Sequence, residues 1–121
     1  MSTREIKALR GATTVERDEP AAIQSAVAEL LKEIMARNEA GRSDLVSIIL
    51  TSTPDLSSEY PAAGARAIGL TDVALLSAVE VAVPRGPRQC IRVLVHLYTD
   101  RAPADLRHVY LRGAAELRRD L

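Results

Sequence analysis

Hydrophobic and polar positions alternate along this chain with two periods, one typical of helices and one typical of strands. The clearest helical period follows Pro20, where apolar residues recur every three or four positions and form one stripe: Ile23, Ala26, Val27, Leu30, Leu31, Ile34 and Met35. The acidic pair Asp18 and Glu19 suits the positive end of a helix, and Pro20 suits its first turn. We predict one long helix that begins at this proline and stops at Gly41.

Five other segments are rich in aliphatic and β-branched residues and predict strands. They span residues 5–14, 45–53, 72–81, 89–100 and 107–117. The first strand is expected to be short and to end at Gly11, and Pro61 opens an alanine-rich helix that closes near Gly69. The order β-α-β-α-β-β-β indicates one domain over residues 1–121 with an α/β (α+β) fold, in which one long and one short helix accompany a mixed five-stranded sheet.

The fourth predicted strand has two different faces. One face is apolar and consists of Ile91, Val93, Val95 and Leu97. The other is mixed and consists of Cys90, Arg92, Leu94, His96 and Tyr98. One long and one short helix can cover only one face of five strands, and the mixed face is too apolar to be left fully wet. We therefore expect copies of the chain to assemble through this face and to enclose a polar site.

Composition excludes several classes of protein. The chain has 16 basic and 16 acidic residues, which argues against binding nucleic acid or an anionic membrane through bulk charge. Cys90 is the only cysteine, and no apolar run resembles a signal peptide or a membrane span, so we expect a cytoplasmic protein. His96 and His108 lack the spacing of zinc ligands, and no glycine-rich phosphate loop is present.

Several charged or phenolic residues stand inside apolar runs: Arg10, Arg66, Glu80, Arg92 and Tyr110. Taken singly, each fits a solvated face or a strand end, and Arg92 with Glu80 fits a structural ion pair. Taken together, they indicate a site, because a buried arginine needs a fixed partner or an anionic ligand. Several arginines with one carboxylate and one tyrosine suit a small dicarboxylate that bears a hydroxyl group.

Four segments of the chain have a familiar order and spacing: LRGATTVERDE, TPDLSSEYPA, CIRVLV and RHVYL. From Arg10 to Leu121 they resemble the monofunctional, AroH-type chorismate mutases. The resemblance implies a homotrimer with a pseudo-α/β-barrel arrangement and active sites at the subunit interfaces. It also implies the Claisen rearrangement of chorismate to prephenate in aromatic amino-acid biosynthesis, without a metal or an organic cofactor.

The resemblance assigns the principal roles in this reaction to four residues. The rearrangement is intramolecular, so the enzyme can act by holding a reactive conformer and by stabilising charge as the ether bond breaks. Arg92 matches the arginine placed beside the breaking ether oxygen and a carboxylate. Glu80 matches the acceptor of the substrate hydroxyl, and Arg10 and Tyr110 match positions that hold a substrate carboxylate.

The resemblance also assigns residues to the wall and the mouth of the pocket. Tyr60 falls where the family often has phenylalanine, and Ser77 stands where a well-known member has cysteine. The remaining positions are two arginines near the mouth, a leucine beside the second of them, and a residue on the pocket-lining strand: Arg66, Arg118, Leu117 and Leu76.

Two other functions remain open at this point. One is a trimeric α/β protein that binds a small carboxylate without transforming it, and the other is an imine deaminase of related architecture. The pairing of Glu80 with Arg92 favours the mutase, because a simple carboxylate binder has no evident need for the acid.

Overall fold

The structure, a computed structural model, describes residues 4–120, the last three by their backbone alone. Its helices and strands follow the predicted order: β1 (Glu5–Thr14), α1 (Pro20–Arg37), β2 (Leu45–Ser52), α2 (Ala62–Ala67), β3 (Ala74–Val79), β4 (Cys90–Thr99) and β5 (Val109–Tyr110). Three 3₁₀ helices complete the described chain: η1 (Arg42–Asp44), η2 (Pro103–Asp105) and η3 (Arg112–Asp120).

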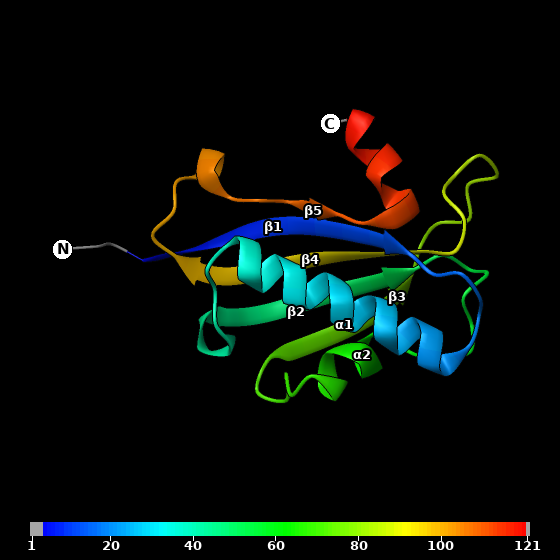
Figure 1. The fold of residues 1–121 in the computed structure, drawn as a ribbon, viewed down its shortest axis with the longest axis horizontal. Coiled ribbons are helices and arrows are strands. Elements are labelled where there is room, and N and C mark those ends of the chain that lie inside the picture. Colours follow the sequence, from blue (N-terminus) through cyan, green and yellow to red (C-terminus); the bar gives the residue numbers. More distant parts are fainter. Residues whose placement is uncertain (1–3, 121) are drawn as a thin grey trace.

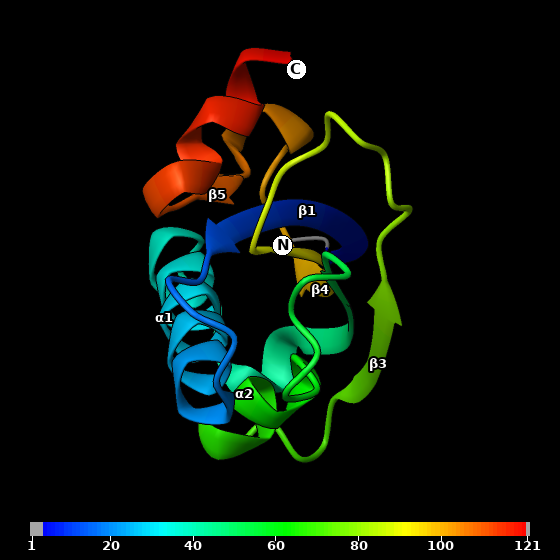
Figure 2. The same ribbon diagram turned by 90° about the vertical axis from the view of Figure 1, so that its right-hand side faces the viewer.

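The five strands form one mixed sheet in the order β3-β2-β4-β1-β5. Strand β4 is antiparallel to both of its neighbours, whereas the outer pairs β2–β3 and β1–β5 are parallel. Helices α1 and α2 lie on the same side of the sheet, as Figures 1 and 2 show. The predicted mixed sheet with one long and one short helix is therefore confirmed.

The hydrophobic core lies between the sheet and the two helices. The apolar face of β4 is buried as predicted, and the buried stripe of α1 packs against it. Gly11 brings the two layers together, because a Cβ at this position would stand 2.7 Å from Ile34 Cδ1. Strand β1 continues through Gly11 to Thr14, so the predicted end at Gly11 is wrong: the glycine serves close packing and does not end the strand.

Helix α1 also ends at a different place from the predicted stop, Gly41. It stops at Arg37 and is capped by Asn38, while Glu39 takes a positive φ of 50°. The buried Asn38 amide donates to the carbonyl oxygens of Ile34 (2.8 Å) and Arg107 (3.0 Å), and its Oδ1 accepts from the Arg107 N–H (2.8 Å). One side chain thus ends the helix and fixes the segment that leads into β5.

Replacing this cap is expected to destabilise the fold. Asn38→Ala removes three hydrogen bonds, two of them to the backbone N–H and carbonyl of Arg107, which should cost about 3 kcal/mol of unfolding free energy. Urea unfolding of the variant measures the loss. Arg37→Ala is the matched control, because the exposed ion pair of Arg37 with Glu33 should contribute under about 0.5 kcal/mol. Equal midpoints for the two variants would contradict the assigned role.

The predicted fifth strand over residues 107–117 is mostly wrong. Only Val109–Tyr110 pairs with β1, and the chain then turns into η3. The turn occurs at Arg112, whose φ is 52°, and the Gly113 N–H donates to Thr14 Oγ1 at 3.1 Å. A strand cannot continue through a residue in the left-handed conformation. The chain therefore leaves the sheet at Arg112, and η3 packs beside β1.

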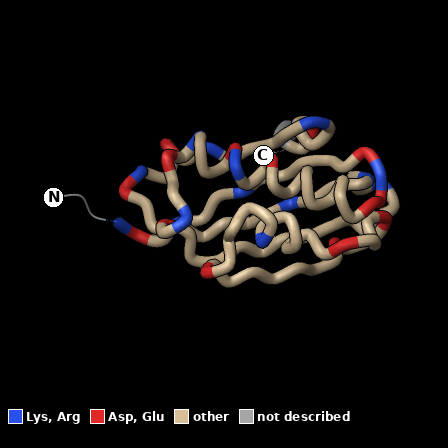
Figure 3. The backbone as a smooth tube through the Cα atoms, turned by 60° about the horizontal axis from the view of Figure 1, so that its bottom comes forward, with Lys and Arg blue, Asp and Glu red and all other residues tan. Residues whose placement is uncertain are grey.

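The sheet face opposite the helices exposes large apolar side chains at Ile6, Leu76 and Tyr98. Charges of both signs are interspersed over the described chain, as Figure 3 shows, in keeping with the balanced composition. No helix of the described residues is long and apolar enough to cross a membrane.

Candidate active site

A cleft of about 1150 Å³ opens on the face of the sheet that the helices leave uncovered. Its walls are the loop between β3 and β4 on one side and η3 on the other, and both rise from the same end of the sheet (Figures 1 and 2). Half of the predicted site residues line it: Arg10, Glu80, Arg92, Tyr110 and Leu117.

The sheet register sets the spacing of the side chains in the cleft. Ala12 pairs with Arg92 of β4 on one side and with Tyr110 of β5 on the other, and Thr51 of β2 pairs with Arg92. Residues paired across neighbouring strands point to the same face. Thr51, Arg92 and Tyr110 therefore form one row across the floor of the cleft, with the small Ala12 between the last two.

Arg92 is not buried in the core, although its strand is. Its side chain is 44 % exposed on the open face, and its Nε lies 3.2 Å from Glu80 Oε2. The period of two along β4 turns Arg92 away from the helices and onto the mixed face, as predicted. The prediction that Arg92 and Glu80 lie together is confirmed.

Glu80 follows directly after β3, where its backbone N–H donates to the Ser52 carbonyl at 2.9 Å. Its side chain is 22 % exposed, and its carboxylate accepts a hydrogen bond from the Thr51 hydroxyl. Thr51 was not among the predicted site residues, since a threonine inside a strand is an ordinary sequence feature. The charge of Glu80 is thus held against β2 and β4 and faces the cleft.

Arg10 supplies a second guanidinium to the cleft. It lies on β1 and pairs with Leu94, two positions along from the row that contains Arg92. Its backbone N–H donates to His108 Nδ1 at 2.9 Å, and no carboxylate of the described residues lies within ion-pair distance of its side chain. Arg10 is therefore available for an anionic ligand.

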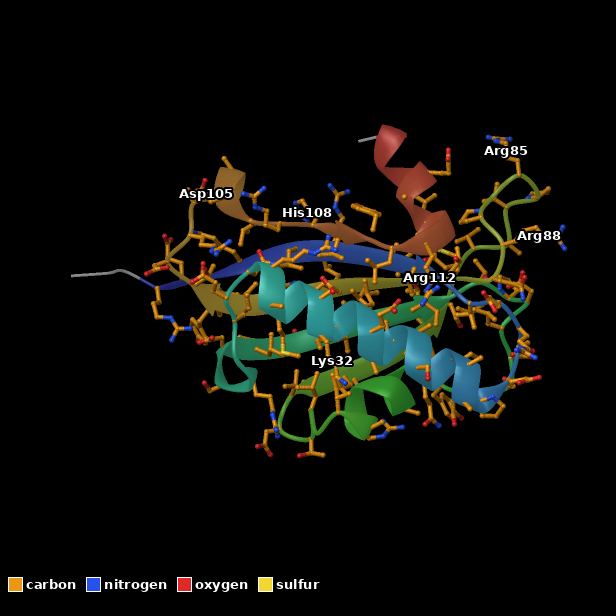
Figure 4. The ribbon with its side chains drawn as sticks, in the orientation of Figure 1. Lys32, Arg85, Arg88, Asp105, His108 and Arg112 are labelled. Carbon is orange, nitrogen blue, oxygen red and sulfur yellow. The ribbon has the colours of Figure 1, made fainter. Side chains whose placement is uncertain are left out.

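The rim adds two further arginines that the sequence analysis did not assign to the site. Arg85 and Arg88 extend from the loop between β3 and β4 (Figure 4), and both line the cleft. The residues lining the cleft include four arginines and two glutamates, so its potential favours anions.

Cys90 lines the cleft and is the only thiol of the chain. Burial raises the pKa of the Cys90 thiol to about 11, against the opposing effect of the nearby Arg92 guanidinium, so the thiol stays protonated at neutral pH. Ser47 Oγ and His96 Nδ1 lie 3.1 Å apart, outside the cleft. Within the described part of the chain, no group of three or more potential metal ligands comes together.

Four predicted site residues do not line this cleft. Tyr60 is 71 % exposed just before α2, Arg66 is exposed on α2, and Leu76 is 62 % exposed on the open face of β3. Ser77 lies on the opposite face, where its Oγ accepts the Ala62 N–H at 3.2 Å. The remaining predicted residue, Arg118, belongs to η3, and its side chain lies outside the described residues.

The fold and the site together define an α+β protein with an arginine-rich cleft on an open sheet face. The family model described as chorismate mutase type I matches residues 6–121. The chain therefore belongs to the type I chorismate mutase family, and the predicted assignment to this family of isomerases is confirmed.

Individual relatives agree over almost the whole chain. The chorismate mutase AroH of Thermus thermophilus is 46 % identical over 117 residues, which cover 96 % of each chain. The chorismate mutase AroH of Bacillus subtilis is 38 % identical and covers 96 % of this chain and 92 % of its own. A solved chorismate mutase from Clostridium thermocellum superposes with a TM-score of 0.89 at 42 % identity, over 91 % of this chain and 98 % of the other.

Proposed function

We propose that the protein rearranges chorismate to prephenate, in aromatic amino-acid biosynthesis, within the cleft that contains Arg92 and Glu80. The observation that supports this most is the ion pair itself: a cation and a carboxylate, 3.2 Å apart, stand in one cleft with the second guanidinium of Arg10. A substrate with two carboxylates, an ether oxygen and a hydroxyl group needs this combination.

Arg92 is proposed to stabilise the charge that develops on the ether oxygen as the C–O bond breaks. Its Nε is directed to Glu80, which fixes the guanidinium on the floor of the cleft before the substrate arrives. A preorganised donor that meets charge formed only in the transition state is worth about 10²–10³ in rate, and a full cation should exceed this. Since the rearrangement is intramolecular, no nucleophile is required.

Glu80, Arg10 and Tyr110 are proposed to select the reactive conformer. Glu80 accepts from the substrate hydroxyl, while Arg10 and Tyr110, on neighbouring strands, hold a carboxylate. Leu117 of η3 closes the apolar side of the same cleft, and we place Arg118, the next residue of η3, near its mouth.

The remaining assigned residues are proposed to reach the substrate from a second copy of the chain. Tyr60, Arg66 and Leu76 do not line the cleft of their own chain, and the open sheet face around Leu76 exposes apolar side chains. Assembly of three copies through these faces would bury them and form the pseudo-α/β-barrel with sites at its interfaces. Because Ser77 holds the N-terminal end of α2, it would contribute by fixing Tyr60 and Arg66 beside it.

The direct test is the loss of chorismate absorbance on addition of purified protein, with prephenate identified after acid conversion to phenylpyruvate. We expect turnover at the same rate with and without a chelator, because the rearrangement is intramolecular and requires no Lewis acid. Absence of turnover, together with protection by chorismate against thermal unfolding, would contradict the proposal and indicate a carboxylate-binding protein.

A further inference from the structure

Thr51 lies in the sheet between Arg92 and Glu80, the ion pair at the centre of the cleft. It pairs with Arg92 of β4 on one side and with Ala78 of β3 on the other, and Glu80 follows two residues after Ala78. Its side chain is half-buried and lines the cleft. Strand β2 thus places one hydroxyl group beside both the cation and the carboxylate.

The hydroxyl has a single hydrogen, and the geometry decides where it goes. Thr51 Oγ1 donates to Glu80 Oε2, whereas the Arg92 carbonyl oxygen is 3.5 Å away, at the limit of a hydrogen bond. An ionised carboxylate can only accept, and hydrogen bonds to charged acceptors are stronger than neutral ones. The hydrogen therefore lies on the line from Thr51 to Glu80.

Both fixed contacts of Glu80 converge on the same oxygen. Oε2 accepts from Thr51 and is also the atom nearest to Arg92 Nε, at 3.2 Å. None of the described residues donates a hydrogen bond to Oε1, and no buried polar side-chain atom among them lacks a partner. It follows that Oε1 is open to solvent in the cleft.

We propose that Thr51 is a positioning residue that occupies Oε2 of Glu80, so that Oε1 is left as the acceptor for the substrate hydroxyl group. A carboxylate held by Arg92 alone can rotate and offer either oxygen. A second donor, from a different strand, fixes the plane of the carboxylate and hence the direction of its open lone pairs. This inference rests on the proposed function of the cleft and adds a residue to it.

Two substitutions at position 51 separate the hydroxyl from the shape of the side chain. Thr51→Val keeps the branched shape and suits a strand, and it should lower kcat/KM for chorismate about tenfold, the order expected for one hydrogen bond to a charged group. Thr51→Ser restores the donor and should recover most of the loss. Ser47→Ala is the matched control, because it removes a hydroxyl from the same face of β2 outside the cleft and should leave kcat/KM unchanged.

A double-substitution cycle with Glu80→Ala shows whether Thr51 acts through the carboxylate. If it does, Thr51→Val should cost almost nothing further in the Glu80→Ala background. An unchanged kcat/KM for Thr51→Val, or the same tenfold loss in both backgrounds, would overturn the proposal. Thermal unfolding of each variant identifies losses due to misfolding. If Thr51→Val fails to fold, the kcat/KM of Thr51→Ser is compared with that of the wild type, and a tenfold loss in this variant would overturn the proposal.

The same set of variants distinguishes failure of this inference from failure of the proposed mechanism. If Glu80→Ala turns chorismate over like the wild type, the role proposed for Glu80 is wrong, and the role of Thr51 is overturned with it. If Glu80→Ala is strongly impaired while Thr51→Val is fully active, Glu80 keeps its role and only the Thr51 inference is overturned.

Discussion

Arg92→Ala is expected to lower kcat for chorismate by about 10³-fold or more while chorismate binding is only partly lost. Arg92 is the cation on the floor of the cleft, and its proposed contact with the ether oxygen strengthens only as the bond breaks, so its removal should act mainly on the transition state. Steady-state kinetics with the chorismate absorbance assay measure kcat and KM separately.

Two further substitutions show whether the effect depends on geometry or on charge. Arg88→Ala removes a rim arginine from the same cleft and should raise KM with little change in kcat. Arg92→Lys keeps the charge but loses the planar fork, and it should recover only part of the lost rate. A wild-type kcat in Arg92→Ala, or an equal loss in Arg88→Ala, would contradict the mechanism.

Residues that follow a simple period along the sequence were predicted well. The stripe of α1 and the alternation of β4 each depend on one face of one element meeting the core, so the sequence of that element suffices. The ends of elements were predicted poorly. Helix α1 stops at Arg37 rather than at Gly41 because the amide of its cap, Asn38, binds a segment about 70 residues away, a partner that no local pattern reveals.

Part of the site could be predicted from the residue types and from the alternation of side chains along each strand. The cleft contains Arg92 and Glu80 as expected, because a charged residue inside an apolar run needs an opposite charge or a ligand beside it. Ser77 was assigned to the same wall as its neighbour Leu76, yet adjacent residues of a strand face opposite sides of the sheet. Thr51 was missed because its role depends on the register of three strands, and register is a property of the assembled sheet.

The assigned residues fall into two groups, one that lines the cleft and one on or near α2. The cleft side holds Arg10, Glu80, Arg92 and Tyr110, and the sheet register alone brings these four together. Arg66 lies on α2, a helix that packs on the other side of the sheet. A residue so placed can contact substrate in this cleft only if the cleft of one copy meets the α2 region of another.

Mixed oligomers of two impaired variants are therefore expected to regain activity. Arg92→Ala damages the cleft side of the site, and Arg66→Glu damages the side proposed to come from the neighbouring copy by placing a carboxylate next to a dianionic substrate. In oligomers reassembled from equal amounts of the two, about a quarter of the interfaces should join an intact cleft to an intact α2 region. Turnover should rise to about a quarter of the wild-type rate per site.

The controls for this experiment isolate the sharing of the site from other causes. Each variant, taken alone through the same dissociation and reassembly, should stay inactive, and sedimentation should give the mass of a trimer for the wild type, both variants and the mixture. A mixture of Arg92→Ala with Glu80→Ala should gain nothing, because both changes damage the same side of the cleft and no interface is then intact. If the Arg92→Ala and Arg66→Glu mixture also gained nothing, both groups would belong to one chain, and the site would be complete within a single copy.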